Sequence, residues 1–578
     1  MKTRKRKKTP SSSDSIADTR FQSKWTPPKV DDGVPSGPLR RKWIDFTAGT
    51  RQLSPEKKKA SSILIAGGGL SACACAAALA EQGYNVQVIT NLESPRHENT
   101  SYLRGGLNAS RNYANDGDSD DRFFRDTMEY GGWQSREADV FRMAQLSGRI
   151  LDICIALCVP FLREEGGMLL PRTYPGGTTA RSFQAHGHTG RQLLIAFYSA
   201  LLRQSSRGCA VITGRREITE IVVKDGHARG IIARNKLNGN EEAYSADAVV
   251  LACGGYSDLY NSVPNHISGG INAIWAAYRA GAALANPCFS LSLPGNSNKW
   301  RNVPEDYNTA QRCPGGLWTD YMLKTTLPGL FAIGEANFSV HGANCMPGNA
   351  PLQELADGLF ILPASIGEYL AKNELPPATA DDIEFSKAID HSKKTKERLM
   401  SVHGKNPPQY FHRKLSQIMR DKAGFIRYSF RLQQALQEIR SLRKEFYSTL
   451  LVPEIRHYNT IYETAFKTAS CLDFSEIIVK DALLRKESCG AHFRMDYSPD
   501  INEKEERHYT RLWFRSPSSQ DIPVQRFLEL SEHSSHNNNK ADERFNEKNS
   551  SQNAKKGRFS GKDKAGKDGK RRKNKRNG

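Results

Sequence analysis

The chain lacks any apolar stretch of the roughly 20 residues that a membrane-spanning helix needs, so no span is expected in its 578 residues. Its start, MKTRKRKKTPSSS, is basic but lacks the apolar run of a secretory signal. The eleven cysteines are scattered without metal-ligand spacing, which predicts reduced thiols and no metal site. We therefore expect a cytoplasmic or mitochondrial-matrix-like protein that is not secreted, with peripheral membrane attachment through a partner as an alternative.

Acidic residues are scarce at both ends of the chain. Residues 1–10 hold six Lys or Arg and no acid, and residues 554–578 hold twelve basic and two acidic residues. These ends supply most of the net charge of +21. We predict disordered basic tails over 1–30 and 516–578. They favour an anionic partner such as RNA, DNA or acidic lipid, or they serve only as a solubilising tail, and both interpretations stay open.

A strand, a glycine turn and a helix are predicted where the tail gives way to the sequence SSILIAGGGLSACACAAALAEQGYNVQVIT. Ile63–Ala66 is an apolar strand, and 71–82 is an alanine-rich helix. Gly67, Gly69 and Ala72 have the spacing G-x-G-x-x-A between them. The first glycine permits a tight turn, the second lets the backbone approach a pyrophosphate, and the small third residue lets the helix pack closely. This arrangement predicts dinucleotide binding at the helix N-terminus.

The second strand of this unit, 84–90, does not end in an acid. Thr90 and Asn91 stand where an Asp or Glu often binds the ribose of a dinucleotide. That absence counts against NAD and leaves FAD open.

The rest of the body alternates strands and helices. Strands are predicted at 209–234, with a turn at Asp225-Gly226, at 248–252 and at 330–333. Residues 31–60 are expected to be irregular. Helices are predicted at 135–158, 189–204, 350–372, over most of 383–450, and at 470–484. The pattern indicates an α/β protein with a Rossmann-like domain followed by a helical domain.

Several segments, taken in order over about 31–515, resemble the flavoprotein subunit of succinate dehydrogenase and fumarate reductase. They are VPSGPLRRKW, ILIAGGGLSA, GGLNASRNYANDGDS, AVVLACGGY, GGLWTDY, LPGLFAIGEANFSVHGAN and ESCGAHFRMDY. The resemblance implies a fold of the two-dinucleotide-binding flavoprotein type. It implies an FAD-binding domain over 31–375, a helical domain over 376–486 and a small C-terminal segment over 487–515. It also implies docking on an iron–sulfur subunit through 485–497.

The position that carries covalent FAD in this family departs from the pattern. Family members attach the flavin to a histidine just before the motif matched by Arg104-Gly105-Gly106, and that position holds Asn99. An amide nitrogen is a poor nucleophile, so FAD is expected to be non-covalent. His97 is two residues away, and a shifted linkage is the alternative.

The substrate positions depart as well. A His-Pro-Thr segment of the family reads Leu293-Pro294-Gly295, a second substrate histidine reads Gln311, and a carboxylate-binding arginine reads Cys345. Two carboxylate groups need cations and donors when they leave water, and these side chains do not supply them. The family's inserted capping domain is expected to be deleted near 295–311, either as a true loss or as an artefact of a truncated gene model.

Features for FAD are better preserved, although Pro347 and Pro351 remove backbone donors beside the flavin and predict weak binding. The residues that the resemblance assigns to the cofactor are Gly67, Gly69, Ala72, Gly105, Gly106, Gly254, Gly255 and Glu335.

The sequence therefore predicts a divergent family member that has lost succinate and fumarate turnover and serves a structural or regulatory role. Two alternatives stay open: a non-covalent flavin oxidoreductase acting on another substrate, and an RNA- or ribonucleoprotein-associated scaffold that uses its basic tails. Whether the chain is an enzyme is left undecided by the sequence.

Overall fold

A computed structural model describes residues 29–173, 179–260, 270–290, 313–338, 340–455, 458–497, 509–515 and 525–531. Its centre is a five-stranded parallel sheet in the order β13-β10-β1-β2-β6. The strands are β1 (Ser62–Ala66), β2 (Asn85–Ile89), β6 (Ala210–Thr213), β10 (Ala248–Leu251) and β13 (Leu330–Ala332). The α/β fold expected from the sequence is confirmed. The strand order reverses at β1, which is where a doubly wound sheet binds its ligand.

Both faces of this sheet are buried, as its continuous apolar strands require. Side chains of β1 alternate between two cores: Leu64 belongs to one, and Ile63 and Ile65 belong to the other. β10 alternates in the same way, with Val249 in the first core and Val250 in the second. The period of two places a hydrophobic layer on each side of the sheet.

The core with Ile63 and Ile65 is covered by helices, which are α3 (Leu70–Glu81), α4 (Asp120–Tyr130), α5 (Glu137–Ala156), α6 (Thr189–Ser206), α8 (Asn349–Ala356) and α9 (Leu362–Lys372). Alanine and cysteine side chains let α3 pack closely against α6. The helices predicted at 135–158 and 189–204 are present. The one predicted at 350–372 is interrupted by a π turn at Asp357–Ile361, a feature that often marks functional sites.

Smaller sheets flank the central one. An antiparallel sheet contains β7 (Arg216–Lys224), β8 (His227–Asn235) and β9 (Glu241–Ser245). The predicted turn between β7 and β8 is correct: φ is +53° at Asp225 and +77° at Gly226, as a two-residue hairpin turn requires. The short strands are β3 (Leu107–Asn108), β4 (Pro171–Arg172), β5 (Ser182–Phe183), β11 (Leu284–Ala285), β12 (Gly316–Leu317), β14 (Ile426–Arg427) and β15 (Phe493–Arg494).

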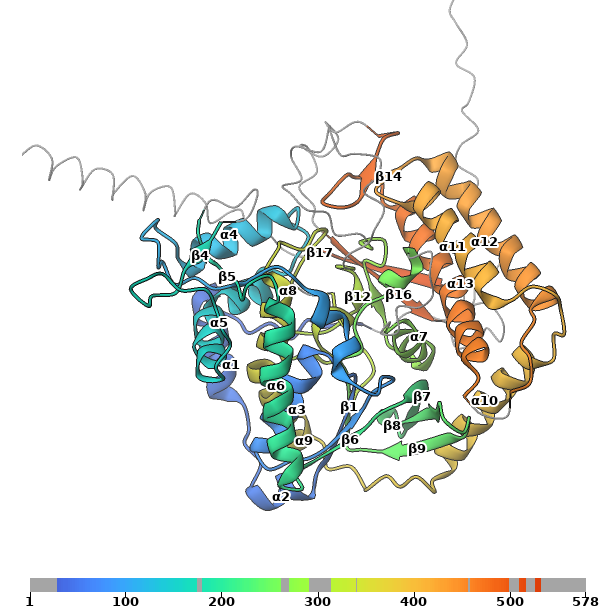
Figure 1. Cartoon of the computed structure of the whole chain (residues 1–578), viewed down its shortest axis with the longest axis horizontal. Helices are drawn as coiled ribbons and strands as arrows, with labels where there is room; N and C mark the ends of the chain where they lie inside the picture. Colours follow the sequence, from blue (N-terminus) through green and yellow to red (C-terminus); the bar gives the residue numbers. More distant parts are fainter. Residues whose placement is uncertain are drawn as a thin grey trace, which may run out of the picture. The chain divides into compact units, whose positions relative to one another are not determined.

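The helical domain packs on the other core, which also includes α7 (Ile271–Ala280). It consists of α10 (Ile383–Met400), α11 (Pro408–Ala423), α12 (Ser429–Thr449) and α13 (Thr460–Leu484). Figure 1 shows α11, α12 and α13 side by side, and each contacts the other two. Among the described helices, none has the length and apolar character to cross a bilayer.

Two expectations about irregular segments are wrong. Within 31–60, the chain forms α1 (Lys42–Gly49) and α2 (Pro55–Ala60). Ser54 accepts a hydrogen bond from the Lys57 amide at 3.3 Å and caps α2, with Pro55 in the first helical position. Within 516–578, β17 (Gln525–Ser531) pairs antiparallel with β16 (Tyr509–Arg515), because a neighbouring strand supplies the hydrogen bonds that the backbone needs. The strongly basic ends, 1–10 and 554–578, lie outside the described residues.

Candidate functional site

The glycine turn connects β1 to the N-terminus of α3. Gly67 has φ +139°, and a Cβ there would lie 2.2 Å from the carbonyl oxygen of Ala252, so the turn tolerates only glycine. The Gly67 amide donates to the carbonyl of Ile89 at 2.8 Å, which fixes the turn to the end of β2. Ala72 is fully buried beneath the turn, as the predicted role of a small third residue requires.

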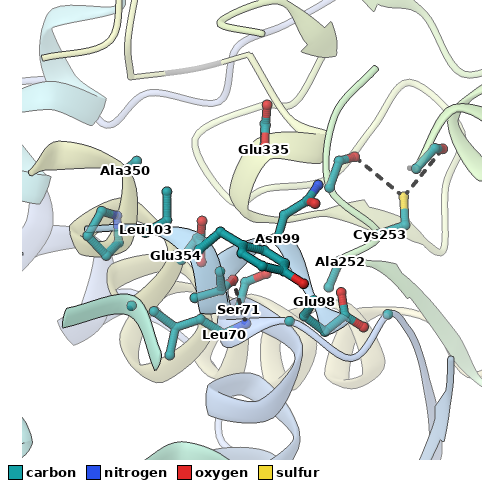
Figure 2. Close-up of a pocket in the computed structure, with 18 of the residues that line it drawn as sticks. Leu70, Ser71, Glu98, Asn99, Leu103, Ala252, Cys253, Glu335, Ala350 and Glu354 are labelled. Atoms are coloured by element: carbon teal, nitrogen blue, oxygen red, sulfur yellow. Dashed lines mark hydrogen bonds between the residues drawn. The ribbon is translucent and has the colours of Figure 1, made fainter. Parts of the chain in front are cut away.

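A cavity of about 760 Å³ opens over this turn. It extends from Ile89 and Asn91 on the β2 side, across the glycine turn, to Cys253 and Glu335, which follow β10 and β13. Figure 2 shows Cys253 and Glu335 on the wall of this cavity. Its volume lies in the range of cofactor sites. Six of the predicted cofactor residues line it, which are Gly67, Gly69, Gly105, Gly106, Gly254 and Glu335.

The other two predicted cofactor residues support the wall from behind. Ala72 belongs to the core under α3. A Cβ on Gly255 would lie 2.7 Å from Oε1 of Glu335, so the missing side chain makes room for that carboxylate. Glu335 Oε1 also accepts a hydrogen bond from the Cys313 amide at 2.9 Å.

The loop that carries Glu335 is held by a buried carboxylate from the π turn. Asp357 Oδ2 accepts hydrogen bonds from the Gly334 amide at 3.0 Å and from Asn337 Nδ2 at 3.1 Å, one residue before Glu335 and two after it. Burial raises the pKa of Asp357 to about 7, although these hydrogen bonds oppose the shift. The π turn therefore positions the Glu335 loop.

Two of the replaced family positions meet at the same cavity. Asn99 and Cys345 both line it, although they are far apart in sequence. His97, the alternative site for a flavin linkage, is exposed and is not part of the lining. Leu293, Gly295 and Gln311, together with the deletion expected near 295–311, lie outside the described residues.

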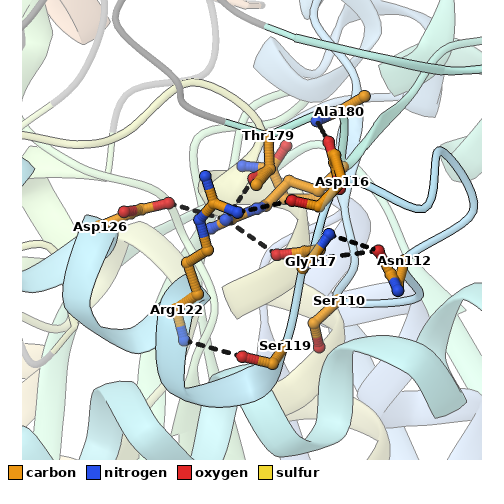
Figure 3. A network of polar contacts seen from close by, with 12 residues as sticks. Ser110, Asn112, Asp116, Gly117, Ser119, Arg122, Asp126, Thr179 and Ala180 are labelled. Carbon is orange, nitrogen blue, oxygen red and sulfur yellow. Dashed lines mark hydrogen bonds and ion pairs between the residues drawn. The ribbon is translucent and has the colours of Figure 1, made fainter. Parts of the chain in front are cut away.

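A polar network holds the segment that follows Gly106 (Figure 3). Asn112 Oδ1 accepts hydrogen bonds from the amides of Gly117 at 3.0 Å and Asp118 at 3.1 Å. Arg181 pairs with Asp118 at 2.9 Å and with Asp126 of α4 at 2.7 Å. The network fixes β3, which pairs with β5 beside the cavity glycines.

Sequence reasoning missed two acids on the cavity wall. Glu98, only 8% exposed, belongs to the loop after β2, and Glu354 belongs to α8. Burial raises the pKa of Glu98 to about 7, with a smaller contribution in the same direction from Glu354 and an opposing hydrogen bond from Thr90. Neither acid belongs to a local motif, so no spacing signal could have identified them.

Comparisons with known proteins agree with this geometry. The family described as FAD binding domain matches residues 62–303 and 307–350, and the family described as fumarate reductase flavoprotein C-term matches 412–536. The chain is 24% identical to the succinate dehydrogenase flavoprotein subunit of Bacillus subtilis, over 77% of this chain and 92% of that protein.

Solved structures share the fold. Quinol fumarate reductase FrdA from E. coli superposes with a TM-score of 0.70 at 19% identity, covering 82% of this chain and 96% of that one. Adenylylsulfate reductase from Archaeoglobus fulgidus superposes with a TM-score of 0.62 at 15% identity, covering 83% and 98%. Because these two proteins are named for different reactions, the shared fold does not identify the substrate.

Proposed function

The chain belongs to the succinate dehydrogenase and fumarate reductase flavoprotein family, and from that premise we propose that it holds FAD without a covalent bond and does not turn over succinate or fumarate. Its role is then structural or regulatory. One observation carries the proposal: Asn99 and Cys345 line the same cavity as the intact glycine turn.

The residues of the cavity fit FAD. The turn at Gly67 brings backbone close to the space above it, and the N-terminus of α3 provides a site for a diphosphate. Glu335, on the far side of the turn, offers a carboxylate to a hydroxyl-bearing part of the ligand. When bound, FAD supplies a centre that accepts and donates electrons. The contribution of the chain is to hold and orient it.

The two replacements remove chemistry that the resemblance leads us to expect. The Asn99 amide is a poor nucleophile toward a flavin, so the chain holds the cofactor without a covalent bond. Cys345 is 6% exposed and carries no cation, so it does not pair with a substrate carboxylate as an arginine would. The sequence changes at Leu293, Gly295 and Gln311 point in the same direction.

We further propose an iron–sulfur protein as the partner. The Bacillus subtilis relative reported above is named as a subunit, and the segment that matches the family's docking region contains β15. We propose that four exposed apolar side chains in or next to this segment make up the docking patch, which are Ile426, Phe430, Leu484 and Met495. Phe430→Asp is expected to abolish co-purification with the partner, whereas Ile383→Asp, an exposed change on α10, preserves it. Loss of the complex in both variants, or in neither, would exclude this patch.

Turnover of the purified protein tests the proposed function. With FAD present in equal amount, succinate–dye reduction and fumarate reduction by a reduced dye are both expected to stay at the background of free FAD. Measurable turnover of either dicarboxylate would refute the proposal. A bound flavin that a different donor reduces would instead support the alternative of an oxidoreductase with another substrate.

A further inference from the structure

Glu98 comes from outside the strand–turn–helix unit but lies against its centre. Its Oε1 stands 3.5 Å from the hydroxyl of Thr90, the residue that follows β2. It also stands 2.6 Å from the point that a Cβ on Gly68 would occupy. The short helix after it begins with Asn99 and places the Thr100 hydroxyl 3.4 Å from the Leu70 amide, at the start of α3. The loop thus places Glu98 beside both the glycine turn and the end of β2.

This is the place that a dinucleotide-binding unit usually gives to an acid. In such units the acid ends the second strand and accepts hydrogen bonds from the ribose hydroxyls, while the glycine turn holds the diphosphate. Here β2 ends in Thr90 and Asn91, which are not acids. Glu98 returns the missing carboxylate to the same position from eight residues further along the chain.

The order of strands separates the roles of the two carboxylates Glu98 and Glu335. β1 carries the turn; β2 lies on one side of it, and β10 and β13 lie on the other. Glu98 stands on the β2 side, whereas Glu335 follows β13 (Figure 2). A ligand with its diphosphate over the turn therefore places one hydroxyl-bearing part beside each of them.

We propose that Glu98 binds the adenosine ribose of the dinucleotide, and that its carboxylate accepts hydrogen bonds from the ribose hydroxyls. This assignment rests on the proposed function, because it requires that the cavity hold FAD. It makes Glu98 the residue that selects a ribonucleotide at this end of the site. The opposite role is also testable: a buried carboxylate beside the turn could repel the diphosphate, so that its removal would strengthen binding.

The test compares ADP with 2′-deoxy-ADP as competitors of FAD binding to the flavin-free full chain. Wild-type protein is expected to bind ADP about tenfold more tightly, the value of one hydrogen bond to a charged acceptor. Glu98→Ala is expected to reduce this ratio to about one. Glu98→Gln keeps the shape of the side chain and should reduce this ratio in part. It provides a second variant in case Glu98→Ala does not fold. Glu93→Gln is the matched control, since Glu93 lies in the same loop but is exposed and pairs with Arg215.

The outcomes separate this proposal from the one it rests on. A ratio that is unchanged in Glu98→Ala overturns the role of Glu98 while leaving FAD binding intact. Tighter binding of both nucleotides by Glu98→Ala, with the ratio unchanged, overturns it in favour of repulsion. Wild-type protein that binds neither FAD nor ADP overturns both proposals.

Discussion

Replacing Glu98 by glutamine should change how stability depends on pH. Burial raises the pKa of this carboxyl from 4.5 to about 7. Between those two pH values the folded protein keeps a proton that the unfolded chain has lost. The free energy of unfolding therefore decreases as pH rises through this window, and the whole penalty is present above about pH 7. The shift corresponds to about 3 kcal/mol, taken as an upper limit.

Glutamine does not ionise, so the variant escapes this penalty. Relative to wild type, Glu98→Gln should gain up to about 3 kcal/mol in unfolding free energy between about pH 4.5 and pH 7. Urea titrations of the flavin-free protein at several pH values measure that gain. Burial also raises the pKa of Asp357 to about 7, and this carboxyl titrates in both wild type and Glu98→Gln. Only the difference in unfolding free energy between the two proteins therefore reports on Glu98.

The exposed Glu93 provides the control for this experiment. Glu93→Gln should show no such increase, because the pKa of Glu93 is lowered by Arg215 rather than raised. A stability difference between wild type and Glu98→Gln that is the same at about pH 5 and about pH 8 would refute the reasoning. It would mean that the Glu98 carboxyl titrates as it does in the unfolded chain.

Three further predictions concern the glycine turn and the C-terminal segment. Gly67→Ala should abolish FAD binding in a spectral titration, because its Cβ would meet the Ala252 carbonyl, whereas Gly83→Ala, where φ is also positive but the space is open, should retain it. Arg494 is fully buried and donates hydrogen bonds to the carbonyls of Ala482 and Arg485. Arg494→Ala should therefore lower the free energy of unfolding by about 3–5 kcal/mol. In a urea titration, a loss no larger than that caused by Arg440→Ala, at a half-exposed arginine, would contradict this. The pKa of Asp496 is lowered to about 2, since hydrogen bonds from Arg494 and Ser429 outweigh its burial. Because Asp496 is exposed and solvent screens its ion pair, at most about 1 kcal/mol of stability should be lost as pH falls from about 4 through about 2, and acid titration of Asp496→Asn should lack that step.

Local patterns in the sequence predict the centre of the molecule well. The strands 63–66 and 248–252 are apolar runs buried on both faces, and the turn at Gly67 is specified by residues that adjoin one another. These features could be predicted because the same few residues determine the conformation and the contacts. The helix α2 could also have been predicted, because Ser54 and Pro55 form a standard start signal.

Other features depend on contacts between distant segments. Glu98 reaches the glycine turn only because the loop after β2 folds back over α3, and nothing in its own spacing shows this. β17 forms against β16, and the stretch of sequence between them is polar, so composition alone suggests a tail. The π turn at Asp357 supports Glu335 through hydrogen bonds to Gly334 and Asn337, which a helical period does not reveal.

We propose above that the chain holds FAD and does not bond to it covalently. The direct measurement is the absorption spectrum of the purified protein after FAD loading, followed by acid precipitation. A flavin spectrum in the protein and all of the flavin in the supernatant are expected, because Asn99 stands where the linking histidine would be. Flavin retained in the pellet would contradict that interpretation of Asn99, and a protein that stays colourless with added FAD would contradict the claim as a whole.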